Sequence, residues 1–574
     1  MITALHRAIN STHKLHTHLA ASMERDNKKR HGHETGNRAD GGELPYNAKR
    51  YPKMRKRSKR HRVCMVCDFF YPRLGGVEMH IWSLSQCLLR RGHRVVVITH
   101  GYDNRKGVRY MTNGLKVYYV PLVPVVDGDC MPTACAFFPI FRQILIRERI
   151  TLVHGHQASS VMSHEAILFA KTMGYRVAYT DHSLFGFADA ASIHLNKLMK
   201  FTMCSVDHAI CVSNTCRENL VVRATLPPEK ISTIPNAIDP SKFTPDPSAR
   251  FPKGTINVVI MSRLVYRKGI DLVAPVVKIM CERYPNLHFI IGGDGPKRLL
   301  LEEMREKSQL HDRVEILGAV PHARVRSVLV RGHIFLNCSL TESFCIAILE
   351  AASCGLFVVS TAVGGVPEVL PGPMIKFAEP TVEDLTDALS DAIPLARKAV
   401  PSEFHAKVRD MYSWADVAER TERAYERALK APPPSLVRRF QAYRRVGMFG
   451  QAVCCFLAAM LHLLWRLLER IWPAQDIELA PEFPSARQAS GFEANPWAPS
   501  KARPSSSSST FSHGFAFSAR RQDEKVLPCP FSDSTIAHLA RGSKRLESQS
   551  YLLLLVWRES GLFYSLSPRS PAPS

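Results

Sequence analysis

Short apolar segments recur along the middle of this chain, and most of them are followed at once by glycine, histidine or other polar residues. A first series occupies 61–70, 94–99, 115–120, 151–156, 176–180 and 208–213, and a second occupies 257–261, 288–291, 313–317, 334–337 and 356–361. Continuous apolar runs of this length are typical of strands buried in parallel sheets, and helical patterns such as 79–91 and 270–283 lie between them. The alternation predicts an α/β protein with two doubly wound, Rossmann-like domains in tandem, over 61–240 and 241–430.

Several polar residues stand where predicted strands end, which is where doubly wound sheets bind their ligands. Gly75 and Gly76 follow the first strand, although such a pair is by itself only a sign of a turn. His182 follows the strand at 176–180, where either a ligand-binding or a structural role is open. Arg263 and Lys268 follow the first strand of the second domain, where two cations suit a diphosphate leaving group without a metal. A surface loop of ion pairs is the alternative for these two.

Residues 340–368 hold two glutamates, Glu342 and Glu350, separated by an apolar run. If a helix starts at Ser343, Glu342 lies at its N-terminal end and Glu350 lies roughly 12 Å further along the axis, at ~1.5 Å per residue. We expect the helix to stop at Gly355 and a glycine-rich turn at 363–368 to start another helix that favours anions. An amphipathic core helix with two solvated acids is the alternative.

The charge of the chain is uneven. It carries 76 Lys and Arg against 51 Asp and Glu, and residues 1–62 hold 16 of these cations but only 5 of the acids. The polar, aperiodic composition predicts that residues 1–60 form a disordered basic arm. An excess of +25 leaves nucleic acid or an anionic membrane as possible partners.

The cysteines and the N-terminus bear on the compartment. The 15 cysteines show no zinc-type spacing, and we expect Cys64 and Cys67, inside the first predicted strand, to be buried reduced thiols. No apolar run near Met1 resembles a signal peptide, so the body of the protein is expected to begin in the cytosol.

The C-terminal part predicts a membrane attachment. A charged amphipathic helix at 412–429 precedes a proline break, and residues 446–465 are mainly apolar and long enough to span a bilayer. Arginines before this stretch favour a cytosolic start, and a helix lying in the membrane surface is the alternative. Beyond about residue 473 no domain is predicted, and 473–574 is expected to be a disordered tail.

Five motifs in order carry a family resemblance: GGVE at 75–78, IPNAID at 234–239, SRLVYRKGID at 262–271, GGDGP at 292–296, and the two glutamates eight residues apart. Together they resemble the GT-B retaining glycosyltransferases of family 4. Residues 154–189 resemble more narrowly the catalytic subunits of the phosphatidylinositol N-acetylglucosaminyltransferases, which make the first intermediate of the glycosylphosphatidylinositol (GPI) anchor. The resemblance covers about two-thirds of the chain, from residue 61 to 429. Ser343 and Cys345 depart from it, because many relatives have glycines there.

The resemblance implies transfer of N-acetylglucosamine from UDP-GlcNAc to phosphatidylinositol with retention at the anomeric carbon. It implies that Glu350 holds the ribose hydroxyls and that Glu342 holds the hexose end. No DxD metal motif is found at the right spacing and the family uses none, so neither a metal nor a cofactor is expected.

The resemblance also gives roles to the polar residues at the strand ends. Arg263 and Lys268 would bind the pyrophosphate and so stabilise the departing UDP. Gly75 and Gly76 would close near it, and His182 would lie beside the sugar and the acceptor.

The implied setting is the endoplasmic reticulum membrane, with the catalytic domains facing the cytosol in a complex with other subunits and no nucleic acid bound. Three alternatives stay open at this point. The chain could be another family 4 enzyme, such as a mannosyltransferase acting on a lipid-linked oligosaccharide, because spacing does not show donor choice. From other classes, it could be a basic nucleic-acid-binding protein or a non-catalytic scaffold protein.

Overall fold

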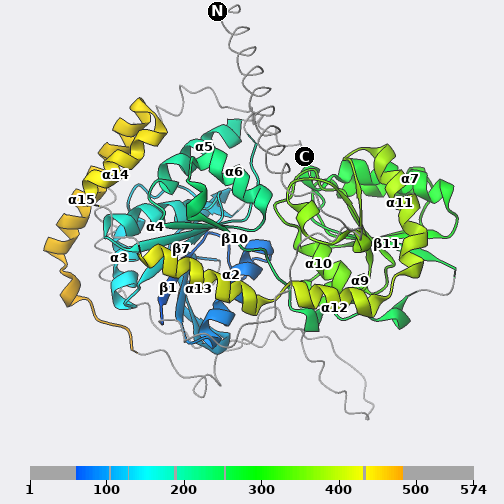
Figure 1. Cartoon of the computed structure of the whole chain (residues 1–574), viewed down its shortest axis with the longest axis horizontal. Helices are drawn as coiled ribbons and strands as arrows, with labels where there is room; N and C mark the ends of the chain where they lie inside the picture. Colours follow the sequence, from blue (N-terminus) through cyan, green and yellow to red (C-terminus); the bar gives the residue numbers. More distant parts are fainter. Residues whose placement is uncertain are drawn as a thin grey trace, which may run out of the picture. The chain divides into compact units, whose positions relative to one another are not determined.

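A computed structural model describes residues 60–102, 105–126, 128–186, 190–250, 254–430 and 435–481. Two α/β lobes follow each other along this part of the chain, as the alternation of apolar segments predicts (Figure 1).

The first lobe is built on an eight-stranded sheet with the order β10-β9-β8-β7-β1-β2-β4-β3, which is parallel except for the edge strand β3. Its strands are β1 (Arg62–Val66), β2 (Arg94–His100), β3 (Gly107–Met111), β4 (Leu115–Val120), β7 (Leu152–His156), β8 (Arg176–Asp181), β9 (His208–Cys211) and β10 (Ile231–Thr233), and a separate hairpin holds β5 (Pro124–Val126) and β6 (Asp129–Cys130). Its helices are α2 (Gly76–Arg90), α3 (Phe137–Arg147), α4 (Val161–Thr172), α5 (Ala190–Met203) and α6 (Asn214–Ala224).

The second lobe is built on a six-stranded, all-parallel sheet with the order β13-β12-β11-β14-β15-β16. Its strands are β11 (Ile256–Met261), β12 (Leu287–Gly292), β13 (Val314–Gly318), β14 (Ile334–Asn337), β15 (Phe357–Thr361) and β16 (Ile375–Ala378). Its helices are α7 (Ile270–Arg283), α8 (Arg298–Lys307), α9 (His322–Leu329), α10 (Ile346–Ser353), α11 (Val382–Lys398) and α12 (Pro401–Met411).

Short 3₁₀ helices join several of these elements. They are η1 (Thr112–Gly114), η2 (Pro228–Lys230), η3 (Pro240–Lys242), η4 (Pro247–Ala249), η5 (Tyr266–Lys268), η6 (Val366–Glu368), η7 (Gly372–Met374), η8 (Tyr443–Val446) and η9 (Ala474–Asp476).

Central strands of both sheets are buried on both faces, which explains their unbroken apolar sequences. Cys64 and Cys67 are fully buried free thiols, as predicted, and burial raises the pKa of both well above the ordinary value. The predicted strand at 61–70 ends early, at Val66, because Asp68 turns inward and its carboxylate accepts hydrogen bonds from the backbone N–H groups of Cys130 and Met162.

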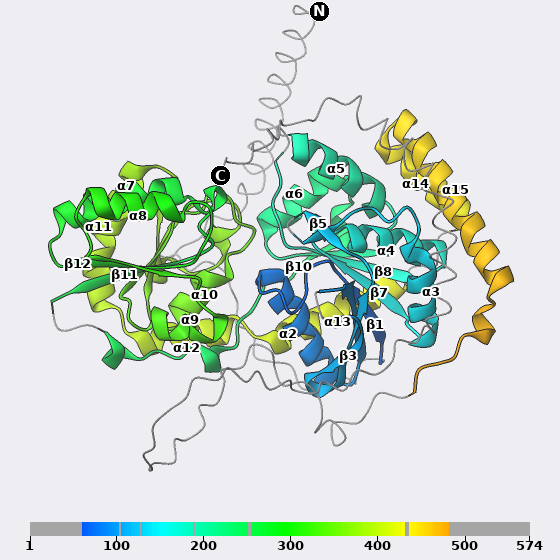
Figure 2. The ribbon, with the colours of Figure 1, turned by 180° about the vertical axis from the view of Figure 1, so that it is seen from behind.

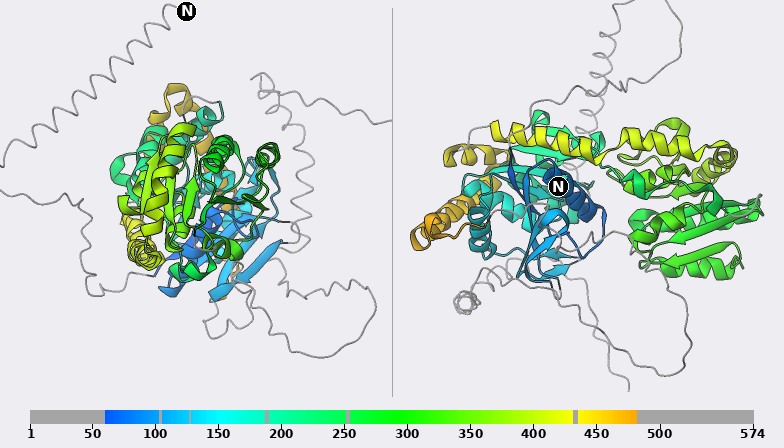
Figure 3. Two further views of the ribbon diagram at one scale, coloured as in Figure 1. Left: turned by 90° about the vertical axis from the view of Figure 1, so that its right-hand side faces the viewer. Right: turned by 90° about the horizontal axis from the view of Figure 1, so that it is seen from below.

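Helix α13 (Trp414–Lys430) returns from the second lobe to the first, as expected for residues 412–429 (Figure 3). The Tyr425 hydroxyl lies 2.8 Å from His154 Nδ1, and Glu422 accepts hydrogen bonds from Arg91 and pairs with His93. These contacts bind α13 to α2 and to the centre of the first sheet.

The C-terminal segment differs from the prediction in two ways. After α14 (Leu436–Ala442), α15 runs from Met448 to Ile471, six residues beyond the expected end at 465. The helix continues because Arg466 and Arg470 stay in solvent while Glu469 pairs with Arg142 of α3. Residues 473–481, predicted as the start of a disordered tail, are ordered against the first lobe (Figure 2). The predicted arm before residue 60, the proline break at 432–434 and the tail from 482 onward lie outside the described residues.

Candidate functional site

A cavity of about 1230 Å³ opens between the two lobes. Its walls include Gly75 and Gly76 at the start of α2, Arg263 after β11, and Ile346 and Glu350 of α10. The carboxyl ends of strands from both sheets therefore meet at one site, as expected for this sheet architecture.

Two helices begin at this cavity. Helix α2 starts at Gly76, three residues before the predicted start, with Gly75 extended at its N-terminus and no side-chain cap. Helix α10 follows Cys345 and also has no side-chain cap. A Cβ added at Gly76 would lie 3.8 Å from Cδ1 of Ile346, so the two helix starts are neighbours. Backbone N–H groups and the helix dipoles at such ends attract phosphate groups.

Of the two predicted cations, Arg263 and Lys268, only Arg263 is part of the cavity wall. Arg263 is exposed and lines the cavity, and its positive charge acts to lower the pKa of Lys268. Lys268 forms an ion pair with Glu342, whose Oε1 also accepts a hydrogen bond of 2.9 Å from Ser339 Oγ. Burial acts to lower the pKa of Lys268, but the Glu342 carboxylate outweighs it and raises the pKa above its ordinary value. Lys268 is therefore a fixed cation at neutral pH.

The two predicted glutamates occupy different elements. Helix α10 begins at Ile346 and not at Ser343. Cys345 adopts a left-handed backbone conformation with φ of 65°, so the right-handed helix cannot extend back past this residue. Glu342 therefore lies in the preceding loop, and the predicted separation along one helix axis is wrong. Glu350 is in α10, faces the cavity, and lies 3.4 Å from His322 Nε2.

The loop that holds Glu342 contacts the first lobe directly. Ser343 Oγ donates a hydrogen bond of 2.5 Å to the carbonyl oxygen of His182. Gly365 donates its N–H to the Glu342 carbonyl oxygen, and a Cβ added at Gly364 would collide with that oxygen. The structure therefore brings Glu342, Lys268 and the His182 backbone to one place.

The glycine-rich turn at 363–368 is not the anion-binding helix start that its sequence predicts. It forms only the 3₁₀ helix η6, and the Gly365 N–H is already used by Glu342. The turn instead contributes an anion of its own. The Glu368 carboxylate accepts hydrogen bonds from the N–H groups of Asn214 and Thr215 at the start of α6. This is a second link between the lobes.

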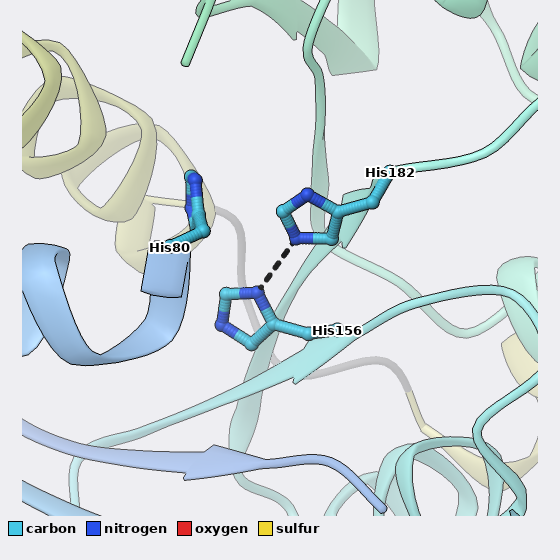
Figure 4. Close-up of side chains that lie close together, drawn as sticks. All are labelled: His80, His156 and His182. Carbon is cyan, nitrogen blue, oxygen red and sulfur yellow. Dashed lines mark hydrogen bonds between the residues drawn. The ribbon is translucent and has the colours of Figure 1, made fainter. Parts of the chain in front are cut away.

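His182 belongs to a cluster of three imidazoles (Figure 4). His156 Nδ1 lies 3.3 Å from His182 Nε2, and the His80 ring packs edge-on against His182 with centroids 4.6 Å apart. His80 also contacts the Asn236 side chain at 2.8 Å and the ring of Trp414. Burial lowers the pKa of His80 to about 4 and, with the neighbouring histidines, lowers those of His156 and His182 well below the ordinary value. All three rings are therefore uncharged at neutral pH.

A buried ion pair positions the His182 loop. The Arg223 guanidinium of α6 pairs with Asp181, and the other oxygen of Asp181 accepts hydrogen bonds from the N–H and hydroxyl of Ser183. Sequence reasoning missed Arg223, and it also missed His80, because both lie inside helices whose inner faces the sequence alone does not identify. Asp181 and His156 end β8 and β7, so their positions at strand ends were the signal that could have identified them.

In the described part of the chain, the histidine cluster is the one set of side chains whose arrangement resembles a metal site, with one ring nitrogen of each within 4.8 Å of the others. Three imidazoles are a ligand set that zinc accepts. The contact between His156 and His182, however, already uses one nitrogen of each ring, and Nδ1 of His80 is engaged with Asn236.

Two protein families match the chain. Residues 100–189 match the family described as PIGA (GPI anchor biosynthesis), and residues 242–395 match glycosyl transferases group 1. The chain is 56% identical over 421 residues to a phosphatidylinositol N-acetylglucosaminyltransferase subunit of Arabidopsis thaliana, and the match covers 73% of this chain and 94% of the relative. It is 54% identical over 418 residues to the gpi3 subunit of the same enzyme from Schizosaccharomyces pombe, with coverage of 72% and 91%.

The fold is shared with solved glycosyltransferase structures. Sucrose-phosphate synthase from Thermosynechococcus elongatus superposes with a TM-score of 0.55 at 19% identity, over 64% of this chain and 98% of that one. This likeness establishes the GT-B fold, with two Rossmann-like lobes. The sequence relatives establish the family: the chain belongs to the PIGA family of phosphatidylinositol N-acetylglucosaminyltransferase subunits, glycosyltransferases that serve GPI-anchor biosynthesis.

Proposed function

We propose that this chain transfers N-acetylglucosamine from UDP-GlcNAc to the inositol of phosphatidylinositol, with retention at the anomeric carbon. The observation that carries the proposal is the identity of more than half of the residues over nearly the whole length of relatives named for that transfer. In the reaction, the bond from the anomeric carbon to the UDP phosphate breaks and a bond to an inositol oxygen forms. The inositol proton leaves with the UDP phosphate.

The cavity between the lobes supports this chemistry. The departing diphosphate gains negative charge, and Arg263 and the starts of α2 and α10 offer positive charge and N–H donors around the cavity. Lys268, a cation at neutral pH that pairs with Glu342, is not itself part of the cavity wall. We assign the pyrophosphate to this group, with Gly76 allowing the close approach of the backbone. Preorganised charge of this kind stabilises the transition state more than the ground state.

Glu350 is assigned to the ribose hydroxyls, because it faces the cavity from the second turn of α10. Glu342 is assigned to the hexose end and also holds Lys268 in place. His182 is assigned to the sugar and acceptor side, where an uncharged imidazole donates or accepts a hydrogen bond without repelling the cationic site.

We assign the reaction to the cytosolic face of the endoplasmic reticulum membrane, in a complex with other subunits, because the relatives are named as subunits and the acceptor is a lipid. One helix among the described residues, α15, is long and apolar enough to cross a membrane.

The test uses membranes from cells that lack their own enzyme of this kind and express this full chain. They are offered phosphatidylinositol with radiolabelled UDP-GlcNAc or GDP-mannose. We expect a labelled glycolipid from UDP-GlcNAc alone, from which a phosphatidylinositol-specific phospholipase releases the label. Glu350→Gln should abolish it, whereas Glu303→Gln, an exposed change on α8, should not. Labelling from GDP-mannose, or none from UDP-GlcNAc, would contradict the proposal.

A further inference from the structure

A second cavity lies within the first lobe and shares no residue with the cavity between the lobes. Its volume is about 380 Å³, which falls in the range of roughly 300–1,000 Å³ that small-ligand sites occupy. Its polar wall combines two residues of β10 with four arginines from α6 and α13: Ser232, Thr233, Arg217, Arg420, Arg423 and Arg427. No aspartate or glutamate of the described chain lines this arginine pocket.

Two of the arginines have acidic neighbours outside the pocket. Arg420 pairs with Asp416 at 3.5 Å, and Arg423 pairs with Glu419 at 3.2 Å, in each case one turn earlier on α13. These carboxylates are about half exposed, with 46% and 53% of their side-chain surface in solvent. Ion pairs of this kind contribute little in water, so a better acceptor inside the pocket can compete for the guanidinium groups.

The other two arginines donate to uncharged oxygens. Arg217 donates to the Pro228 carbonyl oxygen at 3.2 Å, and Arg427 donates to the Ser232 hydroxyl at 3.0 Å. The Nε–H of Arg217 is buried and has no hydrogen-bond partner among the described residues. Because a buried donor without an acceptor is costly, the pocket is short of acceptor atoms as well as of negative charge.

A neighbouring histidine adds no negative charge to this surplus. His208 Nε2 lies 2.8 Å from the same Ser232 hydroxyl that Arg427 contacts. Burial lowers the pKa of His208 to about 4, and the charges of Arg427 and Lys230 act in the same direction. The imidazole is therefore uncharged at neutral pH, and the surroundings of the pocket stay positive.

The chemistry of arginine indicates the class of ligand. A guanidinium group presents parallel N–H donors that match the oxygens of a phosphate group. Donors that converge on a cavity from two helices suit a compact anion better than they suit an extended acidic polypeptide. A phosphate monoester carries a charge of about −1.5 to −2 at pH 7, which matches the two arginines that have no acidic partner in the described structure.

We propose that the arginine pocket binds a phosphate monoester, which then joins α13 to α6 and β10. The monoester belongs either to a soluble molecule or to the headgroup of a phosphorylated inositol lipid, since both present the same doubly charged group. The pocket is separate from the cavity assigned to the transfer reaction, so this proposal and the proposed function can fail independently.

The first test measures protection of arginines in the purified full-length chain, kept in detergent. Phenylglyoxal modifies accessible arginines, and mass spectrometry of the peptides reports each position. We expect a phosphate monoester to protect Arg423 and Arg427 at a concentration about tenfold lower than it protects Arg283 and Arg324, two exposed arginines of the second lobe. Equal protection at the four positions, or none, would overturn the proposal.

Three probes distinguish the sources of the phosphate group. Inositol 1,4-bisphosphate is the soluble monoester, and dioctanoyl phosphatidylinositol 4-phosphate is the lipid monoester. Protection by the lipid at a much lower concentration assigns the pocket to a lipid headgroup, and equal protection by both assigns it to a soluble ligand. Dioctanoyl phosphatidylinositol, which has only a phosphodiester, should not protect, and protection by it equal to that by the monoesters would overturn the proposal.

The second test uses matched variants. In Arg423→Gln/Arg427→Gln, the monoester concentration that half-protects Arg217 should rise about tenfold or more. Arg283→Gln/Arg324→Gln removes the same charge from the second lobe and should leave that concentration unchanged. An equal rise in both variants would assign the binding to the overall charge of the chain. Arginines that are protected only by partner subunits, and not by phosphate, would assign the pocket to an acidic protein, and either outcome would overturn the proposal.

Discussion

Replacing Lys268 with methionine removes the cation that pairs with Glu342 while keeping a flexible side chain. In the proposed reaction this cation faces the charge that develops on the departing diphosphate. Removing one preorganised electrostatic contact of this kind costs about 10²–10³-fold in rate, or about 2.7–4 kcal/mol. We therefore expect kcat/KM for UDP-GlcNAc to fall by that factor in Lys268→Met.

A loss of stability has to be separated from a loss of catalysis. In Lys268→Met the Glu342 carboxylate keeps the Ser339 hydroxyl but loses its ion pair, which costs about 1–3 kcal/mol for a largely buried group. The double variant Lys268→Met/Glu342→Gln removes both charges, so it should recover most of the stability and none of the activity. Arg267→Met is the control, because Arg267 is exposed one position away.

The assay is the radiolabelled transfer reaction in membranes, with the amount of folded chain measured by limited proteolysis. If Lys268→Met keeps activity within about threefold of the parent, the cation does not act on the transition state and the assignment is wrong. If the double variant recovers activity along with stability, Lys268 serves only to neutralise Glu342.

Four further outcomes follow from the geometry. Arg223→Met leaves the Asp181 carboxylate buried and unpaired, so urea unfolding should show a loss of about 3–5 kcal/mol. Cys345→Gly relieves the left-handed backbone at φ of 65° and should raise the free energy of unfolding by up to about 1 kcal/mol, whereas an unchanged free energy of unfolding would refute the strain. Because the pKa of His80 is about 4 when folded against 6.5 in its ordinary state, protonation favours the unfolded chain as pH falls below 6.5. The parent should therefore lose about 2 kcal/mol from this residue between pH 7 and pH 5, and His80→Gln should show a shallower pH dependence of unfolding. Dialysis against EDTA should leave transfer activity intact, whereas loss restored by zinc would assign a metal to the histidine cluster.

Much of the fold was predictable because parallel strands are buried on both faces and so have unbroken apolar sequences. The strand predicted at 334–337 and the helix predicted at 270–283 have the bounds that the structure shows. The antiparallel edge strand β3 was missed, because its sequence, Gly-Val-Arg-Tyr-Met, contains no unbroken apolar run. The start of α10 was misplaced, since a non-glycine residue at positive φ, here Cys345, is not visible in a sequence.

The candidate site was predictable only in part. Gly76 and Arg263 were chosen from their positions after predicted strands, and Glu350 from its spacing to Glu342; all three line the cavity. The pairing of Lys268 with Glu342 was not foreseen, because it depends on a loop that turns back after β14. Likewise, His80 of α2 meets His182 only in the folded chain, because the two residues are about a hundred positions apart and their contact leaves no local signal in the sequence.

One short segment, Tyr412 to Trp414, joins the second lobe to the first. Tyr412 donates its hydroxyl to the Val369 carbonyl oxygen in the second lobe, at 2.6 Å, while Trp414 packs on His80 in the first. Only Ser413 separates two residues that are fixed to different lobes, so the chain crosses between the lobes here, as it also does after β10. Both aromatic residues also line the cavity. A rotation of one lobe about Ser413 would therefore change the wall of the cavity to which we assign the sugar nucleotide.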